Sequence, residues 1–254
     1  MSGSIYLAAS GAMLEQMRLE VLANNIANVG TPGFKQDLPI FRVSAPSQDP
    51  LAASTGTGED STAIQEIQPY TPPFDYRTDF STGALQKTGN PLDLALVGNG
   101  FFVIRTPEGE RYTRQGSFRL NDEGVLCSQD GYPVLGQGGE IAIDGRQVAV
   151  GQDGSIEVDG QQVAKLRLVN FSAPENLRKV GSSLFVNAAE SGANQESEAT
   201  DVQVDQGFIE TSNVNAIRAM TDMIECLRVS EAYQKVIRSA DEATAQTIND
   251  VGSV

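Results

Sequence analysis

Two stretches with helical apolar spacing lie at opposite ends of this 254-residue chain, and they constrain its fold more than any other feature. They cover residues 3–35 and 207–250. In the first stretch, apolar residues recur at alternating intervals of three and four, the heptad spacing of a helix that packs along a seam. The seam consists of Ile5, Ala8, Ala12, Glu15, Leu19, Leu22, Ile26 and Val29, of which only Glu15 is polar.

The second stretch has a comparable seam with one shift in register. It begins with Ile217, Met220, Ile224 and Leu227 and continues through Val229, Tyr233, Val236, Ala240 and Ala243. A shift of this kind is typical of a stutter in a coiled coil. The two ends are therefore predicted to be long helices that pack as a coiled coil and carry the rest of the chain as an insertion. An ordinary amphipathic helix pair that closes a globular domain is the alternative.

The middle of the chain, residues 74–187, has the pattern of β-structure. Short apolar runs such as residues 94–97, 101–104 and 166–169 are separated by Asn-Gly, Glu-Gly and Asp-Gly pairs, which favour tight hairpin turns. No helix-length crossover separates these runs, so a parallel α/β sheet is not expected. The prediction is an α+β fold, in which an antiparallel all-β domain (a barrel or a sandwich) is inserted between the terminal helices.

Two stretches rich in small and polar residues, 44–63 and 188–203, read as linkers. The expected organisation is an N-terminal helix over residues 1–35, an extended linker segment over 36–74, a β-rich domain over 75–203 and a C-terminal helix over 204–254.

Composition excludes several classes of function. The net charge of -15 argues against nucleic-acid binding, and the absence of histidine removes Ser-His-Asp catalysis and every His-dependent metal site. No metal, cofactor or catalytic group is expected. No run of 18 apolar residues is present, so no membrane insertion is expected, and the N-terminus lacks the features of a cleaved secretory signal. Tyr112, Phe118 and Tyr132 are expected in the β core, with an exposed carbohydrate-binding row as the alternative.

The end of the first helix is rich in asparagine, a poor helix former. Asn24, Asn25 and Asn28 lie within five positions, before a Thr-Pro-Gly-Phe turn. Their amides are expected to hydrogen-bond between packed subunits and so to specify register, with exposure at a fraying helix end as the alternative. Gly30 is the expected left-handed cap of the first helix, and Ser212 or Asn213 the expected N-cap of the last helix.

Three motifs in this chain closely resemble signatures of the flagellar axial proteins, the family of rod, hook and hook-associated proteins. Residues 23–35 read ANNIANVGTPGFK, residues 90–103 read NPLDLALVGNGFFV, and residues 207–215 read GFIETSNVN. These match, in order, the ANNxANxxTxGFK signature, the LDxAxxGxGFF box of rod proteins and the QGxxExSNVN motif before the C-terminal helix. The short passage through residues 130–141 and the sequence YQKVI at 233–237 resemble proximal rod subunits, with a distal rod subunit as the alternative.

The resemblance implies a structural subunit that polymerises through its terminal helices, transmits torque from motor to hook and forms part of the export channel wall. It implies that the chain is not an enzyme and that it resides in the flagellar basal body after type III export without a cleaved signal peptide. Implied partners are copies of itself, other rod subunits, the export apparatus and, indirectly, hook and ring proteins. A secreted cell-wall-binding module is a weaker alternative. The expected assembly contacts are Ile5, Leu19, Leu22, Asn24, Asn25, Ile26, Asn28, Phe34, Asn213, Asn215, Ile217, Met220, Ile224, Leu227, Tyr233 and Val236.

Overall fold

The computed structural model describes residues 2–41, 74–145, 147–181, 183–187 and 194–252. The predicted linkers at 44–63 and, in part, at 188–203 lie outside the described residues. The chain divides into two compact units. The helical unit contains Met1–Ala23, Leu38–Arg77 and Ile217–Val254, and the β unit contains Asn24–Asp37 and Thr78–Ala216.

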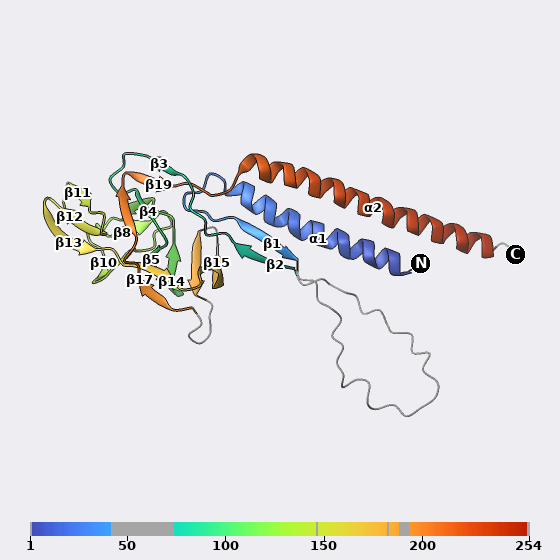
Figure 1. The fold of residues 1–254 in the computed structure, drawn as a ribbon, viewed down its shortest axis with the longest axis horizontal. Helices are drawn as coiled ribbons and strands as arrows, with labels where there is room; N and C mark the ends of the chain where they lie inside the picture. The colour runs from blue at the N-terminus through green and yellow to red at the C-terminus, as the bar shows by residue number, and fades with distance from the viewer. Residues whose placement is uncertain (1, 42–73, 146, 182, 188–193, 253–254) are drawn as a thin grey trace, which may run out of the picture. The chain divides into compact units, whose positions relative to one another are not determined.

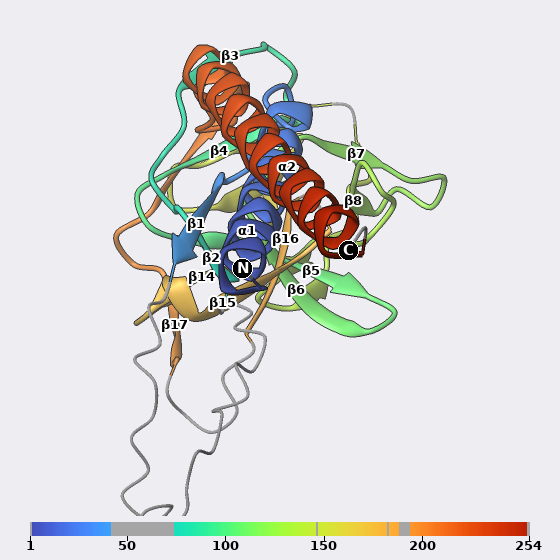
Figure 2. The same cartoon turned by 90° about the vertical axis from the view of Figure 1, so that its right-hand side faces the viewer.

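Each terminal stretch contains a long helix, as the heptad spacing predicts, but strands Gln203–Gln206 and Phe208–Glu210 lie where the C-terminal helix was predicted to begin. Helix α1 spans Ser2–Ala27 and helix α2 spans Ala216–Gly252. The helices run antiparallel and lie side by side in the helical unit (Figures 1 and 2). The thiol of Cys226 donates to the carbonyl of Glu15 at 2.9 Å, and a Cβ added to Gly11 would lie 2.5 Å from the Tyr233 ring. No helix in the described part of the chain combines the length and apolarity needed to cross a bilayer.

The face of α2 that meets α1 differs in part from the predicted seam. Ala219 and Cys226 are buried, and Tyr233 lies against Gly11, so the inward face repeats every seven residues through these three positions. The first part of the predicted stripe points elsewhere, because Ile217, Met220, Ile224 and Leu227 are 81%, 51%, 54% and 44% exposed. The spacing found apolar positions of α2 correctly. It did not show which of them face α1, because α2 has more apolar residues than α1 covers.

The largest sheet of the β unit has six antiparallel strands in the order β15-β16-β6-β5-β14-β17. Its strands are β5 (Phe101–Thr106), β6 (Gly109–Thr113), β14 (Leu168–Phe171), β15 (Leu177–Val180), β16 (Leu184–Asn187) and β17 (Glu196–Glu198), with a 3-10 helix η1 (Pro174–Asn176) before β15. The position of strand β5 in the sheet explains why residues 101–104 are all apolar. Phe101 and Val103 enter one core cluster while Phe102 and Ile104 enter the other, because alternate side chains face opposite sides of a sheet and this strand is covered on both.

The remaining strands form small antiparallel sheets. A three-stranded sheet joins β11 (Val148–Val150), β12 (Ser155–Val158) and β13 (Gln161–Lys165), and the predicted Asp159-Gly160 turn links its last two strands with positive φ at both residues. The two-stranded pairs are β1 (Asp37–Phe41) with β2 (Phe74–Thr78), β3 (Leu85–Lys87) with β19 (Phe208–Glu210), β4 (Leu94–Val97) with β18 (Gln203–Gln206), β7 (Phe118–Leu120) with β8 (Leu126–Ser128), and β9 (Leu135–Gly136) with β10 (Gly139–Glu140). The antiparallel prediction is confirmed. The described strands form one open six-stranded sheet with satellite sheets in place of one closed barrel.

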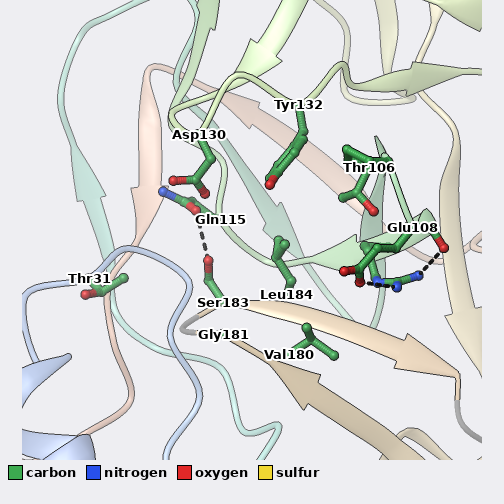
Figure 3. Close-up of a pocket in the computed structure, with 12 residues that line it drawn as sticks. Thr31, Thr106, Glu108, Gln115, Asp130, Tyr132, Val180, Gly181, Ser183 and Leu184 are labelled. Atoms are coloured by element: carbon green, nitrogen blue, oxygen red, sulfur yellow. Dashed lines mark hydrogen bonds and ion pairs between the residues drawn. The ribbon is translucent and has the colours of Figure 1, made fainter.

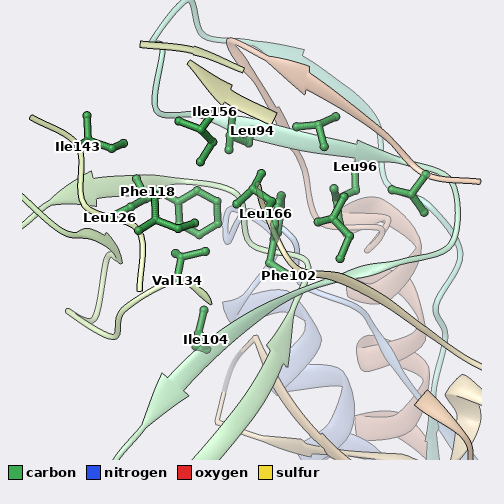
Figure 4. Packing of buried hydrophobic residues seen from close by; sticks show 14 of the residues in the cluster. Leu94, Leu96, Phe102, Ile104, Phe118, Leu126, Val134, Ile143, Ile156 and Leu166 are labelled. Carbon is green, nitrogen blue, oxygen red and sulfur yellow. The ribbon is translucent and has the colours of Figure 1, made fainter. Parts of the chain in front are cut away.

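The larger core cluster connects these sheets. Leu94 and Leu96 from β4 lie with Phe102 from β5 and Leu166, while Phe118, Leu126 and Val134 come from the β7–β9 region (Figure 4). Phe102 and Phe118 meet edge to face, with ring centroids 5.0 Å apart. The pairings of β3 with β19 and of β4 with β18 tie residues 203–210 into the same unit.

Candidate functional site

The two signature motifs that lie near the ends of the chain meet inside the β unit. We name this region the motif junction and define it as residues 25–37, 78–83 and 207–214 together with Arg114 and Lys179. Two main-chain hydrogen bonds show the approach of the two motifs: the amide of Gly33 donates to Glu210 O at 2.7 Å, and the amide of Asn213 donates to Phe34 O at 3.3 Å. Main-chain hydrogen bonds thus join residues that lie more than 170 positions apart in the sequence.

The turn after α1 requires glycine at position 33. Its φ is +68°, and a Cβ there would lie 2.4 Å from the amide nitrogen of Gln115 and 2.5 Å from the carbonyl carbon of Arg114. The prediction of a left-handed cap at Gly30 is wrong, because Gly30 does not have a positive φ. The terminus is closed instead by Asn28, whose side-chain amide donates to Asn24 O at 2.9 Å.

The Gly-Phe-Lys segment buries three consecutive residues. Phe34, an expected assembly contact, is fully buried within its own chain, and the ammonium of Lys179 lies 4.2 Å from the centroid of its ring. Lys35 is also fully buried, which is rare for lysine. The Lys35 ammonium donates to Glu210 Oε1 at 2.6 Å and to Ser81 O at 2.7 Å.

The Lys35–Glu210 pair and Arg114 form a buried charge cluster. The side chains of all three residues are at most 2% exposed, and Arg114 Nε lies 3.8 Å from Glu210 Oε2. Burial lowers the pKa of Lys35, and the negative charge of Glu210 opposes that shift. Burial also lowers the pKa of Arg114, and the negative charge of Glu210 again opposes the shift. Glu210 is therefore the anion that opposes the effect of burial on both cations.

Asn25 uses both ends of its amide within its own chain. Its Nδ2 donates to Asp37 O at 2.8 Å, and the amide of Asp37 donates to its Oδ1 at 2.9 Å. Asn25 is only 4% exposed, whereas Asn24 is exposed. The Asp37 carboxylate accepts from Thr78 at 2.7 Å and from Lys179 at 2.7 Å, so a second buried ion pair adjoins the first.

Asn213 connects segments of the β unit and does not cap a helix. Its Oδ1 accepts from the amide of Gln36 at 2.7 Å, and its Nδ2 donates to Asp79 O at 2.9 Å. Because α2 begins at Ala216, the prediction that Ser212 or Asn213 is its N-cap is wrong. The hydroxyl of Ser212 accepts from the amide of Val214 at 3.3 Å and so stabilises the local turn.

The other predicted assembly residues have mixed exposure. Leu22 is buried, while Ile5, Leu19, Ile26, Asn28 and Tyr233 are half-buried. Exposed positions are Asn24, Asn215, Ile217, Met220, Ile224, Leu227 and Val236. The exposed apolar members all belong to α2, and we name Ile217, Met220, Ile224 and Leu227 the α2 outer stripe. Lys35, Arg114 and Glu210 of the motif junction are thus buried within the β unit, while the α2 outer stripe faces solvent.

A pocket of about 590 Å³ lies in the β unit and shares Thr31 with the motif junction (Figure 3). Two pairs of its lining side chains bond to each other: Ser183 Oγ donates to Gln115 Oε1 at 3.0 Å, and Arg111 donates to Glu108 at 3.1 Å. Its lining consists of Thr31, Thr106, Pro107, Glu108, Arg111, Gln115, Asp130, Tyr132, Val180, Gly181, Ser183 and Leu184. The alternative of an exposed aromatic row is wrong, because Tyr112 and Phe118 are 7% and 2% exposed and Tyr132 is half-buried against the larger core cluster.

Sequence reasoning missed the charged members of the motif junction. Lys35 and Glu210 lie inside the two signature motifs, so an ionisable residue within each motif was a signal for a buried pair. Arg114 carries no such local signal, because only the chain path shows that it reaches Gly98 O at 2.6 Å and approaches Glu210.

Models of three protein families match the chain in order. "Flagella basal body rod protein" matches residues 5–35, "Flagellar hook protein FlgE/F/G D1 domain" matches residues 95–158, and "Flagellar basal body rod FlgEFG protein C-terminal" matches residues 205–250. The first and third of these segments carry the two motifs that meet at the motif junction.

Similar proteins align over nearly the whole chain. Flagellar basal-body rod protein FlgG of Bacillus subtilis is 33% identical over 97% of this chain and 98% of the relative. Flagellar basal-body rod protein FlgF of Caulobacter vibrioides is 33% identical over 100% of both chains. Flagellar basal-body rod protein FlgF of Mesorhizobium japonicum is 33% identical over 100% of this chain and 99% of the relative. With three ordered matches and full-length relatives of this kind, the chain belongs to the flagellar basal-body rod protein family.

Proposed function

We propose that this chain is a structural subunit of the flagellar basal-body rod that polymerises through its terminal helices. The observation that carries the proposal is the α2 outer stripe, which leaves four large apolar side chains in solvent on a helix that already packs on α1 with another face. Clustered exposed apolar residues mark interaction surfaces. A helix with two apolar faces is suited to a bundle in which each helix contacts more than one neighbour.

Hydrophobic burial would drive the assembly. Each large side chain removed from water contributes roughly 1.5–3 kcal/mol, or about 25 cal/mol per Å² of apolar surface. The α2 outer stripe would pack as a coiled-coil seam against helices of neighbouring subunits, with spacings of three and four between its members. Tyr6, Leu7 and Met13 are exposed large apolar residues among the described side chains of α1 and would add apolar surface to such contacts.

In this proposal the rod core consists of helices α1 (Ser2–Ala27) and α2 (Ala216–Gly252), and residues 28–35 and 204–215 belong to the β unit. The motif junction stiffens the β unit, because buried ion pairs and main-chain hydrogen bonds join its N-terminal and C-terminal segments. That stiffness suits a part that transmits torque from motor to hook. Assembly requires no catalysis, and we propose a non-enzymatic role.

Names of the relatives include both FlgF and FlgG, so position along the rod is a finer proposal. We favour the proximal rod, because the passage through residues 130–141 and the sequence YQKVI at 233–237 resemble proximal rod subunits. Relatives named FlgF and FlgG both align over nearly the whole chain at 33% identity, so the alignments do not separate the two positions. The distal rod is the alternative.

The remaining parts of the proposal concern delivery and partners. We propose export by the flagellar type III system without a cleaved signal peptide, followed by contacts with further copies, other rod subunits and the export apparatus, and indirectly with hook and ring proteins. The α2 outer stripe and the half-buried residues of α1 are the proposed contacts. Phe34, Asn25 and Asn213 would contribute by fixing the chain path, since their described partners lie in the same chain.

The test replaces Ile224 or Leu227 with Asp in cells that carry no other copy of the gene. Motility, electron microscopy of isolated basal bodies and circular dichroism of the purified chain are the readouts. We expect short or absent rods and lost motility with unchanged helix content, while the charge-matched Gln234→Asp variant on the exposed part of the same helix assembles. Full-length rods in both stripe variants would refute assembly through this stripe. In a deletion strain, the length at which the rod stops distinguishes a proximal from a distal position.

A further inference from the structure

The Glu210 carboxylate is bonded unevenly. Its Oε1 accepts from the Lys35 ammonium at 2.6 Å and from the amide of Gly83 at 2.8 Å. Its Oε2 is buried and has no hydrogen-bond partner among the described residues. A bare carboxylate oxygen in the interior of a protein is costly, because desolvation of a charged group is recovered only through hydrogen bonds.

The Arg114 guanidinium faces this oxygen with unused donors. Its Nη2 donates to Gly98 O at 2.6 Å and its Cζ lies 5.6 Å from the centroid of the Phe101 ring. Its Nε and Nη1 are buried, and neither has a hydrogen-bond partner in the described part of the chain. The gap of 3.8 Å between Nε and Glu210 Oε2 exceeds the length of a direct hydrogen bond.

We propose that one buried water molecule occupies a site between Arg114 and Glu210 and completes the charge cluster. A water about 2.8 Å from each atom forms the third corner of a triangle whose base is this gap. It accepts from Arg114 Nε and donates to Glu210 Oε2, so it satisfies both groups at once. Buried waters of this kind typically serve polar groups that would otherwise be unsatisfied.

The chemistry of the site selects water over an anion. The cluster has two cations, Lys35 and Arg114, and one anion, Glu210, so its net charge alone would favour a halide. An anion beside Oε2 would meet a carboxylate oxygen that needs a donor, and like charges at short range repel. Water supplies an acceptor to Arg114 and a donor to Glu210.

The water site would connect the two motifs of the motif junction to the rest of the β unit. Lys35 links the N-terminal motif to Glu210 in the C-terminal motif, and the water links Glu210 to Arg114 at the end of β6. Arg114 in turn holds Gly98 in the turn between β4 and β5. A single water therefore joins both motifs to the core of the β unit.

The first test is a crystal structure of the full chain at a resolution that shows ordered waters. We expect density for one water within hydrogen-bond distance of both Arg114 Nε and Glu210 Oε2. Direct contact between these two atoms, with no water between them, would overturn the proposal. Density with halide anomalous signal after bromide soaking would overturn it in favour of an anion site.

The second test uses the full chain in solution and does not depend on crystals. In NMR spectra of the isotope-labelled protein, the Nε–H signal of Arg114 should exchange slowly and show cross-relaxation with a long-lived water. The matched control is Arg105, whose side chain is 55% exposed and should exchange fast with bulk water. An Arg114 signal without any contact to water would contradict the proposal.

Discussion

The Lys35–Glu210–Arg114 cluster predicts an unequal response to two single substitutions. Lys35→Met removes one cation and leaves Glu210 facing Arg114, so one ion pair remains. Glu210→Gln keeps the shape of the side chain but leaves two buried cations without an anion. Removing one partner of a buried pair costs about 3–5 kcal/mol, so we expect Lys35→Met near the lower end and Glu210→Gln near the upper end.

The hydrogen bonds around Glu210 support this order. Lys35→Met loses the bonds of the ammonium to Glu210 Oε1 at 2.6 Å and to Ser81 O at 2.7 Å. In Glu210→Gln, either orientation of the amide turns its NH₂ group toward a donor, because Lys35 and Gly83 face one oxygen and Arg114 faces the other. Since both changes act on one contact, the double variant should be less destabilised than the sum of the singles by about 1–3 kcal/mol.

The cost of Glu210→Gln should also depend on pH. Burial already lowers the pKa of Lys35 below 10.5, and Glu210 is the main group that raises it, so the substitution lowers this pKa further. Between the native pKa and 10.5, the unfolded chain binds more protons than the folded chain, and the free energy of unfolding rises with pH. The penalty of Glu210→Gln should therefore shrink from pH 7 toward pH 10, while the penalty of Lys35→Met should grow, because the wild-type chain gains stability as Lys35 loses its proton and the Met variant does not.

Urea unfolding followed by circular dichroism and tyrosine fluorescence measures these quantities. The chain has no tryptophan, and Tyr112 and Tyr132 report on the β unit. Fits must allow separate transitions for the two units. The control is Glu140→Gln, which breaks the exposed 3.1 Å pair with Arg105 and should cost less than about 1 kcal/mol. Equal costs for Glu210→Gln and Glu140→Gln would refute the reasoning.

Three further predictions concern single positions with matched comparisons. Gly33→Ala should destabilise the β unit by more than about 2 kcal/mol in urea unfolding, since φ is +68° and a Cβ would meet main-chain atoms, whereas Gly30→Ala, with nothing within 4 Å, should be close to neutral. Asn25→Ala should cost about 2–3 kcal/mol through two lost buried hydrogen bonds, and the exposed Asn24→Ala less than about 0.5 kcal/mol; equal effects would contradict the placement. Burial raises the pKa of the Cys226 thiol from 9.0 to about 11, so its contribution to stability is present below pH 9 and is lost as pH rises toward 11. Cys226 should accordingly resist iodoacetamide at pH 8 until urea separates α1 from α2, and fast labelling of the folded chain would disprove the helix pairing.

The sequence determined the elements of this protein because their signals are local. Heptad spacing marked both terminal helices, and the stop of α1 at Ala27 follows from the asparagines, glycines and proline that come next. Glycine turns and short apolar runs marked the antiparallel strands, including the Asp159-Gly160 hairpin. The motifs at the two ends also identified the family, because they are dense in residues with special backbone or hydrogen-bonding properties.

Only the tertiary structure decided which side chains serve the interior and which remain for partners. Periodicity marks an apolar stripe but cannot say what covers it, so the predicted seam included Ile217 and Ile224, which are exposed, and omitted Cys226, which is buried against α1. Asn213 was assigned to a helix cap from its position in sequence, yet it bonds Gln36 and Asp79, which lie far away along the chain. Lys35 and Glu210 are separated by 175 positions, and Arg114 belongs to neither motif. A buried charge is stable only where its partners converge, and that convergence is a property of the folded chain path.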